Sequence, residues 1–150
     1  MKPSITAVSL ITRFEGLKLD AYVCPAGKIT IGAGTTIYPN DTAVKMGDKC
    51  TKEQAQGYLM HDLERRAKAI GDLPVNQNQY DAIISFVYNV GIANWNNSTL
   101  RKLVKANPKD EDIYNEFLKW NKLRSKGKMV VSNGLTNRRV AEATLYNKHI

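Results

Sequence analysis

The sequence contains little cysteine and little histidine. Only two of each occur among its 150 residues. Two cysteines, Cys24 and Cys50, are too few for a small disulfide-stabilised scaffold. The chain has no Cys-x-x-Cys pair, and neither histidine lies at a useful spacing from another ligand. We therefore predict a protein that needs no metal and no cofactor.

Long hydrophobic runs are also missing. The N-terminal stretch ITAVSLITRF is short and is interrupted by Ser9, Thr12 and Arg13. It is too short and too polar to span a bilayer, and it does not have the pattern of a signal peptide. We expect the chain to fold in the cytoplasm with reduced thiols. Internal repeats, low-complexity tracts and linkers are absent too, so residues 1–150 are predicted to form a single domain.

The composition is that of an ordinary globular protein, with 24% charged and 43% hydrophobic residues. The net charge of +8 favours an anionic partner, such as nucleic acid, an anionic membrane or the bacterial cell wall. A basic surface can also serve solubility alone. The sequence has no recognition-helix or RNP-type motif, so nucleic acid is not the expected partner.

The first third of the sequence predicts one helix followed by a small sheet. Ser4 is placed to cap a helix that stops at Gly16, which puts Glu15 at its carboxyl end. Residues 19–38 are rich in strand-forming side chains. Within them, Cys24-Pro25-Ala26-Gly27 fits a type I turn. We predict a small antiparallel sheet of two or three strands.

The remainder of the sequence predicts helices. A capping box begins at Thr51 and a second cap-like opening at Asn76, and the latter opens a mostly apolar helix that we expect to be central and buried. Further helices are predicted over 98–103, 113–120 and 135–146, and the polar residues 125–134 are predicted to form a loop. The fold class is α+β, mainly α, with a small N-terminal sheet lobe, a larger helical lobe and a cleft between them.

Glu15 has the position expected of a general acid at the edge of such a cleft. A glycosidase needs a carboxyl group that is still protonated near neutral pH. The partial negative charge at the carboxyl end of a helix favours the protonated form there. A solvated glutamate in the last turn of a helix would occupy the same position, so residue type and position alone do not assign the role.

The residues that follow Glu15 form a recognisable pattern. Cys24 lies nine positions after it, Thr30 six positions later, and Thr30 is followed by Ile31-Gly32-Ala33-Gly34. This spacing resembles the signature of the phage-type lysozymes, the endolysin family classified as glycoside hydrolase family 24. Residues 79–91, QYDAIISFVYNVG, resemble that family's central helix, and residues 134–146, GLTNRRVAEATLY, resemble its last helix. The resemblance covers nearly the whole chain and implies a lysozyme-like fold.

The resemblance also implies roles for the residues of the opening pattern. Glu15 matches the general acid, while Cys24 takes a place where other members have an Asp that positions or activates water. Cys24 could activate water, attack the sugar carbon or only line the site, and a small buried thiol is the plain alternative. The Thr30 hydroxyl can both donate to and accept from a water below the sugar ring. Asp20, the nearest other acid, is interpreted as a solvated residue that precedes the strand.

Further site residues are implied in the helical part. Arg139 matches the family's arginine that pairs with the catalytic glutamate, although Arg138 and Arg139 would also suit a solvated basic pair. Tyr88, Asn89 and Ser98 are candidates for binding sugar or peptide groups. For Tyr88 the alternative is a core position, and Asn89 near a helix end could simply cap the backbone.

These observations support three functions. The first is a phage endolysin that hydrolyses the β-1,4 bond between N-acetylmuramic acid and N-acetylglucosamine in peptidoglycan. The second is a lytic transglycosylase, because the place of the second acid is occupied by Cys24 and that reaction needs only one acid/base. The third is a non-enzymatic basic binder of the cell wall. We expect a monomer that contacts the anionic wall peripherally after release through a membrane pore made by another protein.

Overall fold

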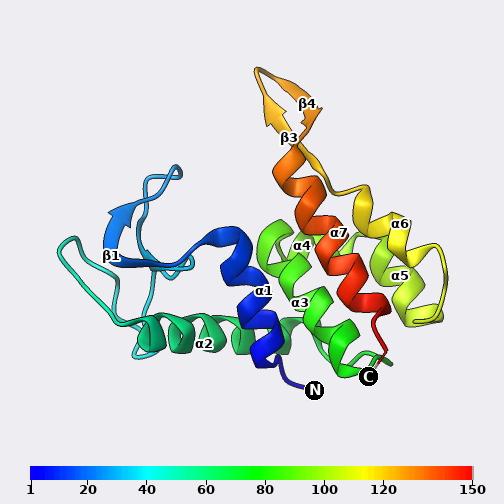
Figure 1. Ribbon diagram of the computed structural model, residues 1–150, viewed down its shortest axis with the longest axis horizontal. Helices are drawn as coiled ribbons and strands as arrows, with labels where there is room; N and C mark the ends of the chain where they lie inside the picture. Colours follow the sequence, from blue (N-terminus) through cyan, green and yellow to red (C-terminus); the bar gives the residue numbers. More distant parts are fainter. Residues whose placement is uncertain (150) are drawn as a thin grey trace. The chain divides into compact units, whose positions relative to one another are not determined.

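The computed structural model describes residues 1–149 and consists of helices with two small antiparallel sheets (Figure 1). This confirms the predicted α+β class with mainly α structure. The contacts divide the chain into two compact units. The first comprises Lys2–Lys68, and the second comprises Ala69 onward together with Met1. The two units are described separately below.

The first unit contains two helices and one two-stranded sheet. Its elements are α1 (Ile5–Glu15), β1 (Lys18–Val23), β2 (Ile29–Gly32) and α2 (Lys52–Ile70), whose last two residues belong to the second unit. Strands β1 and β2 pair antiparallel, and isolated bridges such as Ile37↔Ala43 extend the β structure. The prediction of a small antiparallel sheet is therefore confirmed.

Helix α1 begins and ends where the sequence predicts. The Ser4 hydroxyl oxygen accepts a hydrogen bond from the Thr6 backbone N–H at 3.2 Å. At the other end, the Gly16 N–H donates to the Thr12 carbonyl at 2.9 Å, with Gly16 at φ +77°. A left-handed residue after the last turn is a common helix stop, and glycine adopts it without the clash of a Cβ. Glu15 is thus the last residue of α1.

Helix α2 opens with the predicted capping box. The Gln54 N–H donates to the Thr51 hydroxyl at 3.0 Å, and the Thr51 N–H donates to the Gln54 side chain at 2.9 Å. A row of fully buried residues then follows at helical spacing: Ala55, Leu59 and Leu63. Strand β2 approaches this row closely, because a Cβ built on Gly32 would lie 3.3 Å from the Ala55 Cβ.

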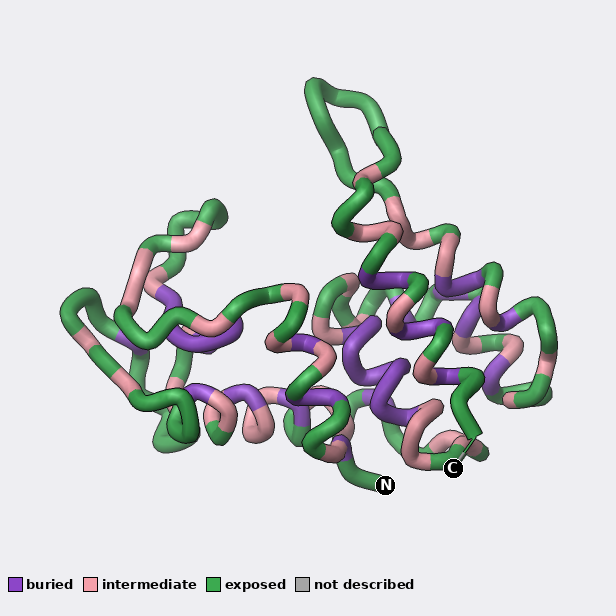
Figure 2. The backbone as a smooth tube through the Cα atoms, in the orientation of Figure 1, coloured by how far each residue is buried: buried purple, intermediate pink, exposed green. Residues whose placement is uncertain are grey.

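The second unit is helical apart from one hairpin. Its elements are α3 (Gln77–Val90), α4 (Ile92–Asn96), α5 (Thr99–Ala106), α6 (Ile113–Leu118), β3 (Lys122–Ser125), β4 (Lys128–Val131) and α7 (Asn133–Asn147). Helix α7 packs against α3 and α6, and α5 packs against α6. The buried stretches of the tube concentrate in α3, which confirms its predicted central position (Figure 2).

An aromatic cluster around Phe86 forms the centre of this unit. The Phe86 ring makes edge contacts with Trp95, Phe117 and Trp120, at centroid distances of 6.3, 5.7 and 5.6 Å. Such T-shaped pairs add about 0.5–1.5 kcal/mol each beyond the burial of their area. Because these rings come from α3, α4, α6 and the segment after α6, the cluster joins most of the helices of the unit.

One prediction for this unit is wrong, and one helix was missed. Residues 125–134 were expected to form a loop, but β3 and β4 pair antiparallel from Lys122↔Val131 to Ser125↔Lys128. Helix α4 was not predicted at all. The hairpin is exposed along its whole length (Figure 2). Because neither strand is half-buried, the hairpin sequence lacks the alternation of apolar and polar residues that would have predicted strands.

Two glycines in the first unit should respond oppositely to alanine. Gly32 has φ +67° and lies against Ala55, whereas a Cβ at Gly57 in α2 would meet nothing within 4 Å. We expect Gly32→Ala to lower the free energy of unfolding by about 1–3 kcal/mol. Gly57→Ala should raise it by about 0.5–1 kcal/mol, since glycine is unfavourable inside a helix. Urea unfolding measures both, and equal effects would contradict the assigned backbone strain at Gly32.

Candidate active site

The turn between β1 and β2 fixes the position of Cys24. The Gly27 N–H donates to the Cys24 carbonyl at 2.8 Å, and the Cys24 N–H donates to the Lys28 carbonyl at 2.9 Å. Gly27 has φ +83°, whereas Ala26 keeps a negative φ, which excludes a type II turn. The loop is therefore a type I turn followed by a left-handed glycine, a common three-residue hairpin connection.

The hairpin register brings Tyr22, Cys24 and Thr30 to one face. Tyr22 lies directly opposite Thr30, and Val23 lies opposite Ile29. Since side chains alternate along a strand, Cys24 shares the face of Tyr22 and therefore of Thr30. Thr30 is buried, with 3% of its surface exposed, while Cys24 is half-buried. The sequence pattern and the geometry thus single out the same pair.

Hydrogen bonds make Cys24 more acidic than an ordinary cysteine. The Lys28 backbone N–H and then the Thr30 hydroxyl donate to the sulfur and lower the pKa of the Cys24 thiol. The Thr30 hydroxyl has only one proton, and the Lys28 carbonyl accepts it at 3.0 Å in the present arrangement. The Thr30 hydroxyl can therefore donate either to the Cys24 sulfur or to the Lys28 carbonyl. A thiolate at Cys24 favours donation to the sulfur.

Glu15 is close enough to Tyr22 for its charge to act on the phenol. Burial is the main cause that raises the pKa of Tyr22, and the nearby charges of Cys24 and Glu15 raise it further. The phenol is therefore within electrostatic range of both groups. Glu15 is exposed at the carboxyl end of α1. The first unit thus places an acidic thiol and a buried hydroxyl on the face of one tyrosine, whose phenol also responds to the charge of Glu15.

Asp20 is not part of this group. It lies within β1 rather than before it, which corrects the prediction that it precedes the strand. Its carboxylate pairs with Lys49 at 2.8 Å, and its side chain is 71% exposed. The interpretation of Asp20 as a solvated residue is confirmed. Asp20 does not take the place of a second acid, and position 24 is occupied by the Cys24 thiol.

Arg139 is the most deeply placed of the predicted site residues. It is fully buried in the second unit, where its Nε lies 2.8 Å from the Glu142 carboxylate. It donates to the Asn89 side-chain oxygen at 2.8 Å, and its guanidinium lies 5.1 Å from the centre of the Phe86 ring. The expected pairing of Arg139 with Glu15 stays a prediction.

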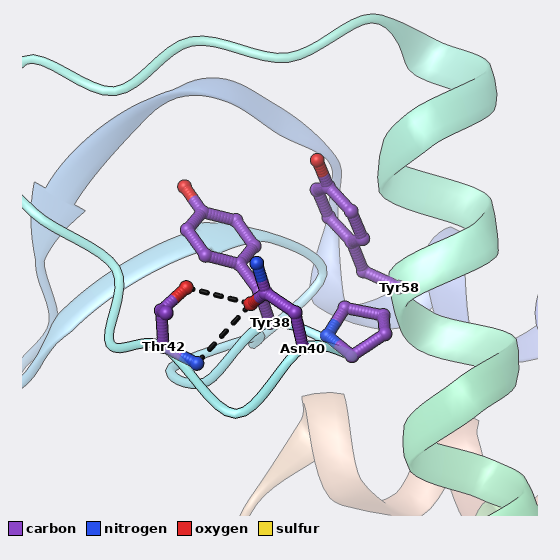
Figure 3. A pocket seen from close by; sticks show the side chains of 5 residues that line it. Tyr38, Asn40, Thr42 and Tyr58 are labelled. Carbon is purple, nitrogen blue, oxygen red and sulfur yellow. Dashed lines mark hydrogen bonds between the residues drawn. The ribbon is translucent and has the colours of Figure 1, made fainter.

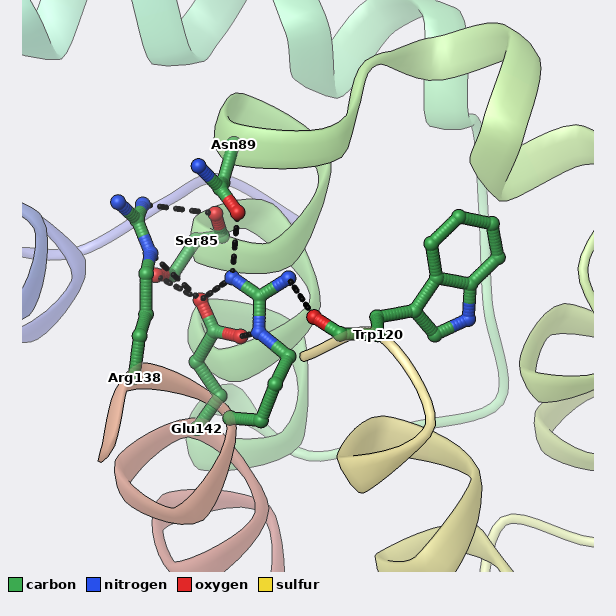
Figure 4. A network of polar contacts seen from close by, with 6 residues as sticks. Ser85, Asn89, Trp120, Arg138 and Glu142 are labelled. Atoms are coloured by element: carbon green, nitrogen blue, oxygen red, sulfur yellow. Dashed lines mark hydrogen bonds and ion pairs between the residues drawn. The ribbon is translucent and has the colours of Figure 1, made fainter. Parts of the chain in front are cut away.

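Glu142, which was not among the residues predicted from the sequence, is the partner of Arg139. Its carboxylate also pairs with Arg138 at 3.2 Å and accepts a hydrogen bond from the Ser85 hydroxyl at 2.5 Å (Figure 4). Burial raises the pKa of Glu142, and Arg139, Arg138 and Ser85 oppose that effect. The alternative of a solvated Arg138–Arg139 pair is wrong, because both are buried. The spacing of Glu142 from them, three and four residues along a helix, was the available signal.

Asn89 and Tyr88 lie at the end of α3. The Asn89 side chain is exposed, and its oxygen accepts from Arg139. The Asn89 side-chain oxygen therefore binds Arg139 and does not cap the backbone. Tyr88 is half-buried. A role of either residue in binding sugar or peptide groups stays a prediction.

Ser98 is a helix cap. Its hydroxyl donates to the Trp95 carbonyl at 2.7 Å and accepts from the Arg101 N–H at 3.0 Å. These two bonds leave it one acceptor lone pair. Ser98 also lines a depression of about 430 Å³ within the second unit, together with Asn97, Thr99, Glu116, Lys119, Trp120, Lys122 and Met129. Its predicted role in substrate binding stays a prediction.

Among residues 1–149, no group of three or more His, Cys, Asp or Glu side chains could hold a metal ion. Within the same residues, no helix is long and apolar enough to cross a membrane.

Comparison with known proteins identifies the family. Residues 12–142 match the model of the Phage lysozyme family, so the chain belongs to that family. It is 41% identical over 141 residues to an endolysin of Acyrthosiphon pisum secondary endosymbiont phage 1, covering 91% of this chain and 92% of that protein. The chain is thus a lysozyme-type peptidoglycan hydrolase.

Solved structures agree with this assignment. The endolysin from Escherichia coli O157:H7 phage FAHEc1 has 41% identity and a TM-score of 0.86, covering 98% of this chain and 94% of that one. The muramidase domain of SpmX from Asticaccaulis excentricus has 29% identity and a TM-score of 0.85, covering 99% of both chains. The lysozyme-like fold predicted from the sequence is confirmed.

The hydrogen bond from Thr30 to Cys24 can be tested by alkylation. We expect Thr30→Val, which removes the hydroxyl at nearly constant shape, to raise the pKa of the Cys24 thiol. The pH at which iodoacetamide modifies Cys24 at half its maximal rate should rise accordingly, because the thiolate is the reactive form. Mass spectrometry of the modified peptides resolves the two cysteines.

Cys50 is the internal control for this experiment. Burial, and then the charge of Asp20, raise the pKa of the Cys50 thiol. In the unaltered chain Cys24 should therefore react at lower pH than Cys50, and Thr30→Val should leave the Cys50 profile in place. An unchanged Cys24 profile in Thr30→Val would show that the hydroxyl stays with Lys28.

Proposed function

We propose that the chain is an N-acetylmuramidase that cleaves the β-1,4 bond between N-acetylmuramic acid and N-acetylglucosamine. The observation that carries the proposal is the grouping of Glu15, Cys24 and Thr30 around Tyr22 within one unit. Membership of the Phage lysozyme family and the likeness to a muramidase domain support the choice of bond. The net charge of +8 suits an anionic wall polymer.

Glu15 acts as the general acid in this proposal. Its carboxyl proton passes to the glycosidic oxygen as the bond to the anomeric carbon of muramic acid breaks. The exposed position of Glu15 at the end of a helix leaves it accessible to a polymer chain. Positioned general acids contribute about 10²–10⁴-fold to such rates.

Cys24 and Thr30 hold the attacking water. Thr30 can donate to or accept from this water, while the lowered pKa of Cys24 makes its thiolate available as a base. The water gives its hydroxide to the anomeric carbon and its proton to the sulfur. Glu15 is then left as a carboxylate and Cys24 as a thiol, and exchange with solvent restores both. A water held between acid and base is the layout of an inverting glycosidase.

A lytic transglycosylase is the second candidate. The observation that favours it is the absence of a carboxylate nine residues after Glu15. In that reaction the muramic acid 6-hydroxyl attacks internally, so neither Cys24 nor a bound water is required. The two reactions give products that differ by one water in mass.

Glu15→Gln tests the acid and the reaction type together. We expect release of fragments from purified peptidoglycan to fall by about 10²–10⁴-fold, because the amide cannot give up a proton. Mass spectrometry of fragments from the unaltered chain should show reducing muramic acid ends that carry one added water. Anhydro-muramic acid ends would identify the transglycosylase instead. Release that does not depend on Glu15 would remove the acid from the mechanism.

Variants of Cys24 test the base. We expect Cys24→Ala to lower the hydrolysis rate by about 10²-fold or more, and Cys24→Asp to retain most of the rate, because a carboxylate can accept the same proton. Cys50→Ala is the matched control, since it removes the other half-buried thiol, which lies outside the β1–β2 hairpin. Full activity of Cys24→Ala would show that the thiol only lines the site.

A further inference from the structure

A second loop in the first unit repeats the geometry of the Cys24 turn. In Tyr38-Pro39-Asn40-Asp41 the Asp41 N–H donates to the Tyr38 carbonyl at 2.9 Å, and the Tyr38 N–H donates to the Thr42 carbonyl at 2.9 Å. Asp41, at φ +68°, takes the left-handed position that Gly27 takes in the other turn. The side chains of this loop are therefore held by a closed hydrogen-bonded backbone.

This loop and helix α2 line an open pocket of about 470 Å³. The lining residues are Tyr38, Pro39, Asn40, Thr42 and Tyr58 (Figure 3). Its volume lies within the range of about 300–1,000 Å³ that is typical of small-molecule sites. None of these residues belongs to the candidate active site, so the pocket is a separate feature of the unit.

The two tyrosine rings form rigid apolar walls. They meet edge to face, with centroids 5.1 Å apart and planes at 62°. The Tyr38 hydroxyl donates to the Asp48 carboxylate at 2.7 Å, and the same carboxylate oxygen accepts from the Lys45 N–H at 2.9 Å. Tyr38 is therefore fixed from its far end, which lowers the entropy lost when a ligand packs against it.

Asn40 offers an oriented hydrogen-bond donor beside these rings. Its side-chain oxygen accepts from the Thr42 N–H at 3.1 Å and from the Thr42 hydroxyl at 2.6 Å. A backbone N–H can only donate, so the atom facing it must be oxygen, and the amide nitrogen points the other way, towards the side of the tyrosine rings (Figure 3). Within residues 1–149 this amide nitrogen has no hydrogen-bond acceptor.

The pocket lining carries no formal charge. The neighbouring acids are already engaged, Asp48 by Tyr38 and Asp41 by an ion pair with Arg65 at 2.9 Å. A ligand that suits the pocket must therefore be neutral, have a flat apolar face for a ring, and carry polar groups for an amide. A pyranose with an N-acetyl group has these properties, whereas a phosphate or a carboxylate does not.

We propose that this pocket is a second carbohydrate-binding site that holds an N-acetylhexosamine unit of a glycan strand. The C–H face of the sugar packs against a tyrosine ring, and the Asn40 amide donates to a sugar oxygen. Such a site would keep the protein on the wall polymer between cleavage events. The proposal goes beyond the muramidase function and does not depend on the roles of Glu15, Cys24 or Thr30.

NMR titration with N,N′,N″-triacetylchitotriose tests the site directly. The full chain carrying Glu15→Gln is used, so that the sugar is not consumed. We expect the backbone amide signals of Asn40, Thr42 and Tyr58 to shift and to saturate together. The proposal would be overturned by signal shifts confined to residues 15–32. It would also be overturned if no signal shifted at sugar concentrations up to about 10 mM.

Asn40→Asp is the decisive variant. The carboxylate keeps both acceptor bonds to Thr42, so the loop remains closed, but the donor to the sugar is lost. We expect the dissociation constant at this site to rise by about two- to twelvefold, as for the loss of one hydrogen bond. Asn137→Asp makes the same charge change at an exposed position in α7 and should leave the constant unchanged. Equal effects of the two variants would show a general charge effect and would overturn the proposal.

Discussion

The left-handed backbone at Gly27 is the constraint on which the candidate active site depends. It closes a type I turn so that Cys24 pairs with Lys28 and Tyr22 pairs with Thr30. A slip of one residue would turn every β1 side chain to the other face and would separate the thiol from the hydroxyl. The turn therefore does more than join two strands, because it sets which side chains can share a proton.

The protein uses this turn twice, with different results. In the first turn, glycine adopts the left-handed conformation and the loop presents Cys24. In the second, Asp41 adopts it at φ +68° and its carboxylate pairs with Arg65 on α2. Aspartate tolerates this region better than most residues, although at some cost in backbone energy. The second loop is thereby tied to the helix that contributes Tyr58.

The second unit is organised around a buried charge rather than around a turn. Glu142 lies between two buried guanidinium groups, and its Oε2 accepts from Ser85 and Arg138 while its Oε1 forms the ion pair with Arg139. Burying ions is costly unless partners surround them, and removal of one partner of such a cluster typically costs about 3–5 kcal/mol. The cluster also connects α7 with α3 through Ser85 and Asn89. It fixes the helix that carries Arg139 and the end of the helix that carries Tyr88.

Local features of the fold were predictable because they involve neighbours in the chain. Hydrogen bonds between residues two to four positions apart form the caps at Ser4, Thr51 and Asn76 and the turn at Cys24. The grouping of Cys24 with Thr30 is also local, because the two residues lie six positions apart across a short hairpin. Tertiary packing decided the rest. It paired Asp20 with Lys49, and it buried Glu142 with its two arginines against Ser85. It also set Tyr58 beside Tyr38. Long-range partners leave no periodic signal in the sequence, since the cost of an unpaired charge or an exposed ring depends on segments far apart in the chain.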